Sequence, residues 1–228
     1  MTPPQRIARI TGLLYLGVAI FGAFAFLYVK DLVRVPGDAA ATAANLVAHA
    51  GLVRIGFVAD LVQATLFLLV VLGFHRLLAP VHQHAARAMA AFVAVAVAIM
   101  CLNAVFQYGA LRLATAPADY PDLGTAHRSL ALLLLDLNLD GFLIAQIFFG
   151  LWLAPLGYLA YRSGMFPRAL GVVLVVGCLG YLADTAVHFL APGAGEAVST
   201  ALTAPAGIAE FWMVGYLLLR GVRRPAAA

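Results

Sequence analysis

Residues 10–29 read ITGLLYLGVAIFGAFAFLYV and contain no charged side chain. A helix rises about 1.5 Å per residue, so a run of roughly 20 residues matches the hydrocarbon core of a bilayer, which is about 30 Å thick. Arg6 and Arg9 precede the run, which is longer than the apolar segment of a cleavable signal peptide. The stretch therefore predicts a retained membrane-spanning helix.

The whole chain has the composition of a membrane protein. Of its 228 residues, 64% are hydrophobic and 11% are charged, and the mean hydropathy is +0.98. Soluble domains are about half apolar and about a quarter charged. We therefore expect one all-α transmembrane domain over residues 1–228, a bundle of six spans. The predicted spans are 10–29, 55–78, 88–111, 135–161, 169–190 and 202–219.

The positions of the basic residues predict the orientation of the chain. Six spans place both termini on one side, and most of the 14 basic residues then share that side. Basic residues are enriched in cytoplasmic loops, so we expect cytoplasmic termini. Arg greatly outnumbers Lys and Ala is abundant, which is typical of a GC-rich bacterial genome. We expect a multipass protein of the bacterial cytoplasmic (inner) membrane.

A long outer loop is predicted between the first two spans, from Lys30 to Arg54. It contains Pro36-Gly37-Asp38 followed by an Ala-rich stretch. This pattern predicts a turn, a helix N-cap at Asp38 and a short amphipathic helix. That helix either covers the outer mouth of the bundle or serves only as a connector.

Polar side chains inside the spans are the candidate functional residues. A charge at the bilayer centre costs about 2.5–3.5 kcal/mol on insertion scales, so such residues are functional hypotheses by default. Counted at about 1.5 Å per residue from the cytoplasmic end, four spans each place one polar side chain at about 24 Å, and Asp140 lies farther out. We expect a polar pocket that opens to the outer face. Its predicted ligand-binding residues are Asp60, Asn103, Asp140 and Gln146.

Three further residues predict acid–base chemistry. Asp184 belongs to the same layer, and His188 follows it by one helical turn, so the carboxylate can orient the imidazole. Glu210 lies about 15 Å from the cytoplasmic end of its span, at the floor of the predicted pocket. The catalytic candidates are therefore Asp184 with His188 as base and Glu210 as proton donor.

Cofactor and metal content stay open at this stage. Asp60, Asp184 and His188 form a set that a metal could use, although the sequence has no dedicated motif for one. Nucleotide-binding loops, dinucleotide fingerprints, serine elbows and zinc-protease helices are absent from the sequence. The expected partners are the lipid bilayer and a lipid-like or cationic small molecule, with no nucleic acid. The oligomeric state stays open.

Residues 143–158, LIAQIFFGLWLAPLGY, resemble a bacterial family of multipass membrane proteins known as domain of unknown function 4386. Further similar stretches are ARITGLLY at 8–15, VPGD at 35–38, YRSG at 161–164 and GYLAD at 180–184. The resemblance covers residues from about 5 to about 190. It implies a multipass membrane protein and brings no assigned activity.

Three functions fit these residues. The first is binding or transport of a cation or of an amphiphile with a polar head, in the outer-leaflet pocket. The second is an intramembrane acid–base enzyme that acts on a lipid or isoprenoid substrate. The third is a structural or partner subunit whose polar residues hold the helices together. The sequence leaves open whether the protein is an enzyme.

Overall fold

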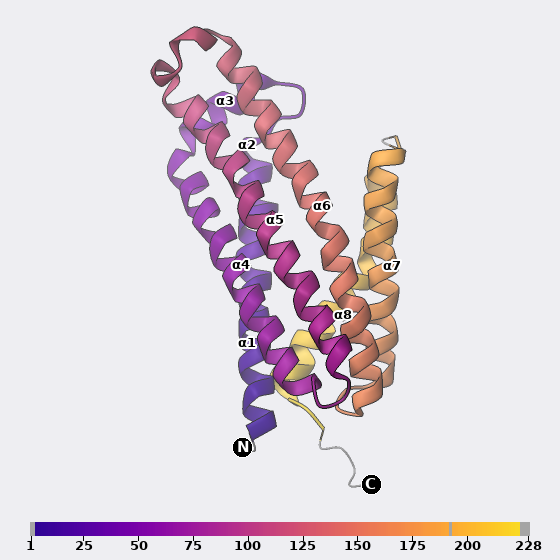
Figure 1. Cartoon of the computed structure of the whole chain (residues 1–228). Helices are drawn as coiled ribbons and strands as arrows, with labels where there is room; N and C mark the ends of the chain where they lie inside the picture. Colours follow the sequence, from indigo (N-terminus) through magenta and orange to yellow (C-terminus); the bar gives the residue numbers. More distant parts are fainter. Residues whose placement is uncertain (1–2, 192, 224–228) are drawn as a thin grey trace. The chain divides into compact units, whose positions relative to one another are not determined.

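The computed structural model describes residues 3–191 and 193–223, and all regular elements in these ranges are helices (Figure 1). Among them, six helices are long and apolar enough to cross a membrane. The all-α fold and the six predicted spans are thereby confirmed. The helices exceed the uncharged runs because their polar ends continue the same backbone hydrogen bonding. Their bounds are Pro4–Val33, Ala50–Leu78, Gln83–Thr115, Ala126–Ser163, Arg168–Leu190 and Glu196–Leu219.

The first span is built from three consecutive elements. The helix α1 passes into the π-helix η1, which passes into the short α2, so the span runs beyond its predicted end at residue 29. The prediction that Lys30 lies in the outer loop is wrong, since this residue is the last of η1. The elements are α1 (Pro3–Gly22), η1 (Ala23–Lys30), α2 (Asp31–Val33), α3 (Ala39–Ala48), α4 (Ala50–Leu78), α5 (Gln83–Thr115), η2 (Pro117–Asp119), η3 (Pro121–Leu123), α6 (Ala126–Ser163), α7 (Arg168–Leu190) and α8 (Glu196–Leu219).

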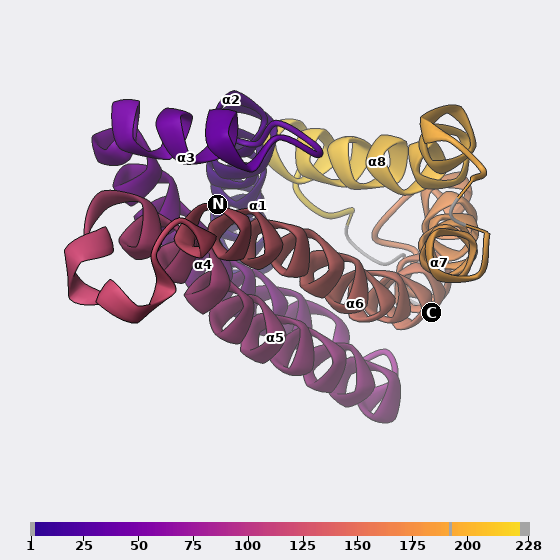
Figure 2. The same ribbon diagram turned by 90° about the horizontal axis from the view of Figure 1, so that it is seen from above.

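The predicted helix of the outer loop is α3. The Asp38 side chain accepts a hydrogen bond from the Ala41 N–H over 2.8 Å, which is the predicted N-cap. Gly37 makes the turn before it with a φ of 76°, a conformation that favours glycine. Thr42 and Leu46 face inward, and α3 lies beside α2 (Figure 2). The prediction of a short helix between the first two spans is confirmed.

The helices form two compact units, which we describe separately. Unit 1 comprises the described residues of 1–16, 66–97 and 143–228, and therefore contains α7 and α8 entire. Unit 2 comprises residues 17–65 and 98–142, and contains η1, α2 and α3 entire. The helices α1, α4, α5 and α6 each contribute one part to each unit.

Glycines bring the helices of unit 1 close together. A Cβ on Gly157 of α6 would lie 2.6 Å from the Gly171 carbonyl oxygen of α7, and one on Gly150 would lie 3.1 Å from the Cys178 carbonyl oxygen. These two contacts run in opposite chain directions, so α6 and α7 pack antiparallel. Small residues of this kind let two helix backbones approach closely. The helices α7 and α8 also pack against each other (Figure 2).

The apolar core of unit 2 joins η1, α2, α3, α4, α5 and α6. The buried core residues are Val29, Val33, Leu46, Val53, Ala110, Leu111, Leu113, Ala114, Ala131 and Leu135.

Candidate functional site

A small cavity lies inside unit 2. The volume that the centre of a water-sized sphere can occupy in it is about 10 Å³. A cavity needs roughly 10–15 Å³ of such volume to hold one water molecule. Polar and aliphatic residues are among those that line it, but the surface that they expose to the cavity is almost entirely apolar. The lining residues are Lys30, Val33, Arg34, Val53, Gln107, Leu135, Asn138 and Leu139.

Asn103 of α5 and Asn138 of α6 hold their helices together by reciprocal hydrogen bonds. The Asn103 Nδ2 donates to the Asn138 main-chain oxygen over 2.7 Å, and the Asn138 Nδ2 donates to the Asn103 main-chain oxygen over 2.9 Å. Because main-chain oxygens only accept, these bonds fix how each amide is turned. Both Oδ1 atoms are buried and have no hydrogen-bond donor within the described part of the chain. The Asn103 oxygen lies against Gly141, where a Cβ would clash with it.

Gln107 lies one helical turn beyond Asn103 on α5 and lines the cavity. Its side chain is 2% exposed, and its Oε1 has no donor among the described residues. Leaving a buried acceptor unsatisfied costs about 1–3 kcal/mol. Such atoms are exceptions in folded proteins, and each requires an explanation.

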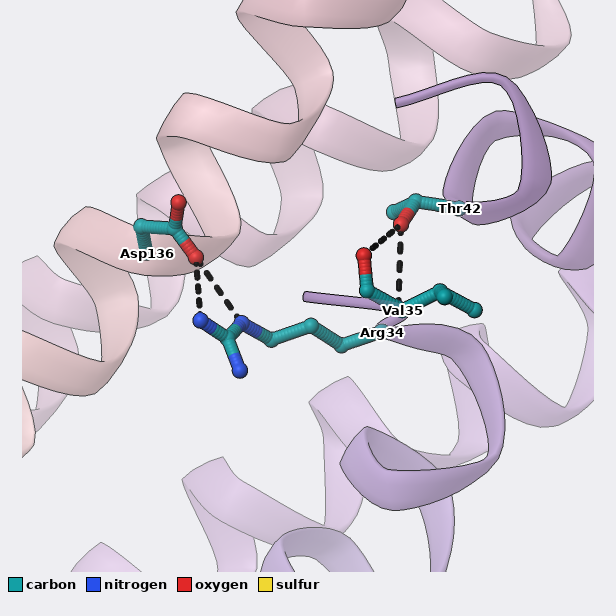
Figure 3. A network of polar contacts seen from close by, with 4 residues as sticks. All are labelled: Arg34, Val35, Thr42 and Asp136. Atoms are coloured by element: carbon teal, nitrogen blue, oxygen red, sulfur yellow. Dashed lines mark hydrogen bonds and ion pairs between the residues drawn. The ribbon is translucent and has the colours of Figure 1, made fainter. Parts of the chain in front are cut away.

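Arg34 is held at the cavity by an ion pair. Its Nε donates to the Asp136 Oδ1 over 2.8 Å, and its Nη2 lies 2.7 Å from the same oxygen (Figure 3). The neighbouring Val35 exchanges two hydrogen bonds with the Thr42 hydroxyl of α3, at 3.0 and 3.2 Å (Figure 3). These contacts tie the segment after α2 to both α6 and α3, and so fix where the guanidinium lies.

Lys30 is a second basic residue among those that line the cavity. The residue is 9% exposed, and its Nζ lies 4.8 Å from the centre of the Phe26 ring and 5.7 Å from that of Phe142. Asp60 of α4 is close enough to interact with it electrostatically. Desolvated cation–π contacts contribute about 2 kcal/mol or more. Lys30 is the last residue of a π-helix, which shifts the register of the residues that follow. This shift and the ring contacts together explain why the lysine lies inside the span instead of in the loop.

In unit 1, Glu210 of α8 accepts hydrogen bonds from two tyrosine hydroxyls. Tyr15 of α1 donates to Oε1 over 2.6 Å, and Tyr181 of α7 donates to Oε2 over 3.1 Å. The Tyr15 ring packs edge-on against Phe74 and Trp152, with centroid distances of 6.2 and 5.8 Å. Three helices therefore meet at one carboxyl group whose two oxygens each have a donor.

Asp184 of α7 is another carboxyl group of unit 1, and it is buried. Its Oδ2 accepts a hydrogen bond from the Gln146 Nε2 of α6 over 2.7 Å, and the same nitrogen lies 3.3 Å from the Thr185 hydroxyl. Thr185 in turn donates to the Tyr181 main-chain oxygen over 3.0 Å. Asp184 thus joins α6 to α7 one helical turn from the tyrosine that binds Glu210.

The sequence of this chain matches a known protein family over nearly all of the helices described above. The sequence profile of a family described as a domain of unknown function (DUF4386) matches residues 10–221. The chain belongs to the DUF4386 family. The resemblance found in the sequence is confirmed, and the match extends beyond it to include α8. Residues of both units therefore lie within the DUF4386 domain, which is a multipass membrane protein of unknown function.

A comparison with curated proteins finds a partial relative of this DUF4386 chain. An uncharacterized protein of Archaeoglobus fulgidus is 34% identical to it over 73 residues, which are 31% of this chain and 43% of the relative. The chain thus spans less than half the length of that relative. No solved structure matches the DUF4386 chain.

The predicted site residues of the DUF4386 domain fall into both units. Unit 1 holds the four predicted on α6, α7 and α8, and brings Gln146 into contact with Asp184. His188 lies one turn farther along α7, where it is exposed and packs edge-on against Phe189 with ring centres 5.0 Å apart. Unit 2 holds the remaining ligand-binding candidates, Asp60, Asn103 and Asp140. That all seven line one pocket stays a prediction.

The sequence did not predict four residues that either bind Glu210 or line the cavity. Tyr15 and Tyr181 supply the donors to Glu210, and Lys30 and Arg34 are basic residues that line the cavity. One of them carried a usable signal, since Tyr181 precedes Asp184 by three residues and therefore shares a face of α7 with it. A lysine at the end of an apolar run ordinarily extends to the headgroups, so Lys30 gave no signal.

The described ranges of the DUF4386 domain assemble no metal site. Within them, no three His, Cys, Asp or Glu side chains are grouped so that they could hold a metal ion.

Proposed function

We propose that this DUF4386 domain binds an amphiphilic small molecule within the membrane, with the polar head of the ligand in the cavity of unit 2. The observation that supports this is a water-sized cavity whose lining residues include Gln107 and Asn138, two buried residues whose amide oxygens lack a donor within the described chain. In hydrocarbon no bulk water supplies the missing hydrogen bond, so such oxygens are costly. A ligand head that donates a hydrogen bond offsets that cost.

The charges at the cavity favour an amphiphile over a bare cation. Lys30 and Arg34 both line it, and the carboxylates near them, Asp60 and Asp136, already interact with these two basic side chains. The aliphatic lining suits the chain of an amphiphile, because apolar groups leave hydrocarbon only for surroundings that are equally apolar. The orientation expected from the basic residues places this site in the outer leaflet of the bacterial cytoplasmic membrane.

Mass spectrometry of the purified protein tests the proposal. Solvent extracts of the full chain in nanodiscs should contain an amphiphile in stoichiometric amount, and Gln107→Met should reduce its occupancy about tenfold or more. Gln63→Met is the matched control, because Gln63 lies in the same unit but does not line the cavity. Equal amphiphile content in both variants would contradict the proposal and favour a structural role for the polar residues.

A second candidate function is acid–base catalysis on a lipid or isoprenoid substrate. It is favoured by the position of Glu210 between two hydroxyl groups that can pass a proton. We expect Glu210→Gln to abolish any product formed from lipid extracts, whereas Glu196→Gln, at the exposed start of α8, should retain it. Equal product formation by the two variants would rule this function out.

A further inference from the structure

The turns at one end of unit 1 are rich in arginine. The arginines lie near the end of a membrane-spanning helix or shortly after it, and their side chains are exposed. The ends of such helices lie at the depth of the lipid head groups. The arginines are Arg76, Arg87, Arg162, Arg168, Arg220 and Arg223.

Contacts between the turns hold this end of unit 1 together. The Arg223 N–H donates to the Met165 main-chain oxygen over 3.1 Å, and the Tyr216 hydroxyl donates to the same oxygen over 3.3 Å. These bonds tie the segment after α8 to the turn between α6 and α7. His82, in the turn between α4 and α5, packs edge-on against the Tyr158 ring of α6, with ring centres 5.7 Å apart. The arginines of these turns therefore share one surface.

The acidic residues of unit 1 lie away from this surface. Two of them lie inside their helices and accept hydrogen bonds there, and the third begins α8, whereas Arg220 follows the end of α8. Within the described ranges none of the six arginines is paired with a carboxylate, and the ion pairs found there belong to unit 2. The surface therefore carries an unbalanced positive charge. The acidic residues of unit 1 are Asp184, Glu196 and Glu210.

Two of the arginines, on either side of the turn between α6 and α7, lie over tyrosine rings. The guanidinium carbon of Arg162 lies 6.0 Å from the centre of the Tyr158 ring, and that of Arg168 lies 5.6 Å from the centre of the Tyr161 ring. A contact of this kind uses the face of the guanidinium. The N–H groups in its plane stay available, and their fork matches the oxygens of a phosphate.

His82 adds a further donor at the Tyr158 ring. Its Nδ1 accepts a hydrogen bond from the Ala85 N–H over 3.2 Å, so its Nε2 carries the ring proton. Arg162 and His82 contact the same ring, so one head group can accept hydrogen bonds from both. Hydrogen bonds from a guanidinium to a phosphate are charge-assisted and are therefore among the strong ones.

We propose that this surface binds an anionic phospholipid, whose phosphate lies at Arg162 and Arg168 beside the turn between α6 and α7. Tyrosine rings favour the depth of the head groups, and clusters of about four to eight basic residues next to a span attract anionic lipids. This depth favours a lipid over an acidic protein segment. The site lies in a different unit from the cavity, so the inference does not rest on the proposed function. Phosphatidylglycerol and cardiolipin share the required phosphate diester.

Native mass spectrometry of the full chain in detergent micelles tests the inference. The protein is offered equal amounts of dioleoyl phosphatidylglycerol and dioleoyl phosphatidylcholine. We expect it to retain about tenfold more of the anionic lipid, and we expect the double variant Arg162→Gln, Arg168→Gln to lose this preference. Tetraoleoyl cardiolipin in place of phosphatidylglycerol should give the same pattern. Each single variant should lower the preference in part, so the test stands even if the double variant does not fold.

Arg112→Gln is the matched control and should keep the preference. Arg112 lies over the Tyr120 ring at 5.7 Å in the same manner, but the Asp119 carboxylate lies 3.9 Å from it and offsets its charge. Equal retention of the two lipids, or an equal loss in the control and the double variant, would overturn the inference. Displacement of the lipid by inorganic phosphate would assign the site to the free ion. If neither lipid is preferred and a polyglutamate peptide binds the wild type but not the double variant, the surface recognises an acidic protein segment and the inference is wrong.

Discussion

Two carboxyl groups of unit 1, those of Glu210 and Asp184, have different surroundings, although they lie on helices that pack together. Glu210 has two hydroxyl donors, whereas the Asp184 Oδ2 is bound by an amide nitrogen from α6. A hydroxyl donor can also accept a proton back, and an amide nitrogen cannot. At the scale of single residues, Glu210 is therefore suited to exchange protons, and Asp184 is suited to hold helices.

The two tyrosines should contribute unequally to stability. The Tyr15 hydroxyl lies 2.6 Å from Glu210 and the Tyr181 hydroxyl lies 3.1 Å from it, and the shorter bond is the stronger. We expect Tyr15→Phe to lower the free energy of unfolding by about 1–2 kcal/mol and Tyr181→Phe by less. Reversible unfolding in mixed micelles measures both, with the exposed Tyr108→Phe as control. A larger loss for Tyr181→Phe would contradict this.

The hydrogen bond between Gln146 and Asp184 should couple the effects of these two residues on stability. Gln146→Leu leaves a buried carboxyl group without its amide donor, so we expect a loss of about 2 kcal/mol in the free energy of unfolding. The double variant Gln146→Leu, Asp184→Leu removes both partners and should recover part of that loss, since replacing a buried pair by apolar residues is often close to neutral. The same unfolding assay applies. Losses that simply add would show that the two side chains do not stabilise each other.

At the scale of elements, the antiparallel contact of α6 with α7 depends on glycine. A Cβ on Gly157 would meet the Gly171 carbonyl oxygen, and backbone must move to relieve it. We expect Gly157→Ala to destabilise the protein by about 1–3 kcal/mol. Gly215→Ala is the control, because no atom lies within 4 Å of its added Cβ and alanine favours helix by up to about 1 kcal/mol. If both variants were equally stable, the close approach would not matter to folding.

The sequence predicted the helix α3 fully, but it predicted the first span only in part. The helix α3 follows from local chemistry, since Gly37 supplies the turn and Asp38 the cap. The π-helix η1 does not follow, because its extra residue is retained by contacts of Lys30 with rings on two elements, Phe26 and Phe142. Contacts of that kind depend on tertiary packing, which a single sequence does not encode in a readable pattern.

At the scale of the molecule, counting along the spans predicts depth but not neighbours. Gln146 and Asp184 were placed at one depth, and they do bind each other. Asn103 was placed at the same depth, yet its side chain binds the main chain of Asn138, which was not a candidate. Rotation of each helix about its axis decides such pairings. The six spans were therefore predictable, whereas the division of the polar residues between two units was not.

The distribution of basic residues predicts the topology of the whole chain, which accessibility labelling can test. Cys101 and Cys178 are free cysteines and would first be replaced by alanine. Single cysteines would then be introduced at two exposed positions, Ala40→Cys in α3 and Gln83→Cys at the start of α5. With six spans and cytoplasmic termini, a membrane-impermeant maleimide should label residue 40 in intact bacteria, and should label residue 83 only after the membrane is permeabilised. The reverse pattern would place the termini outside, and the cavity residues Lys30 and Arg34 would then lie towards the cytoplasm.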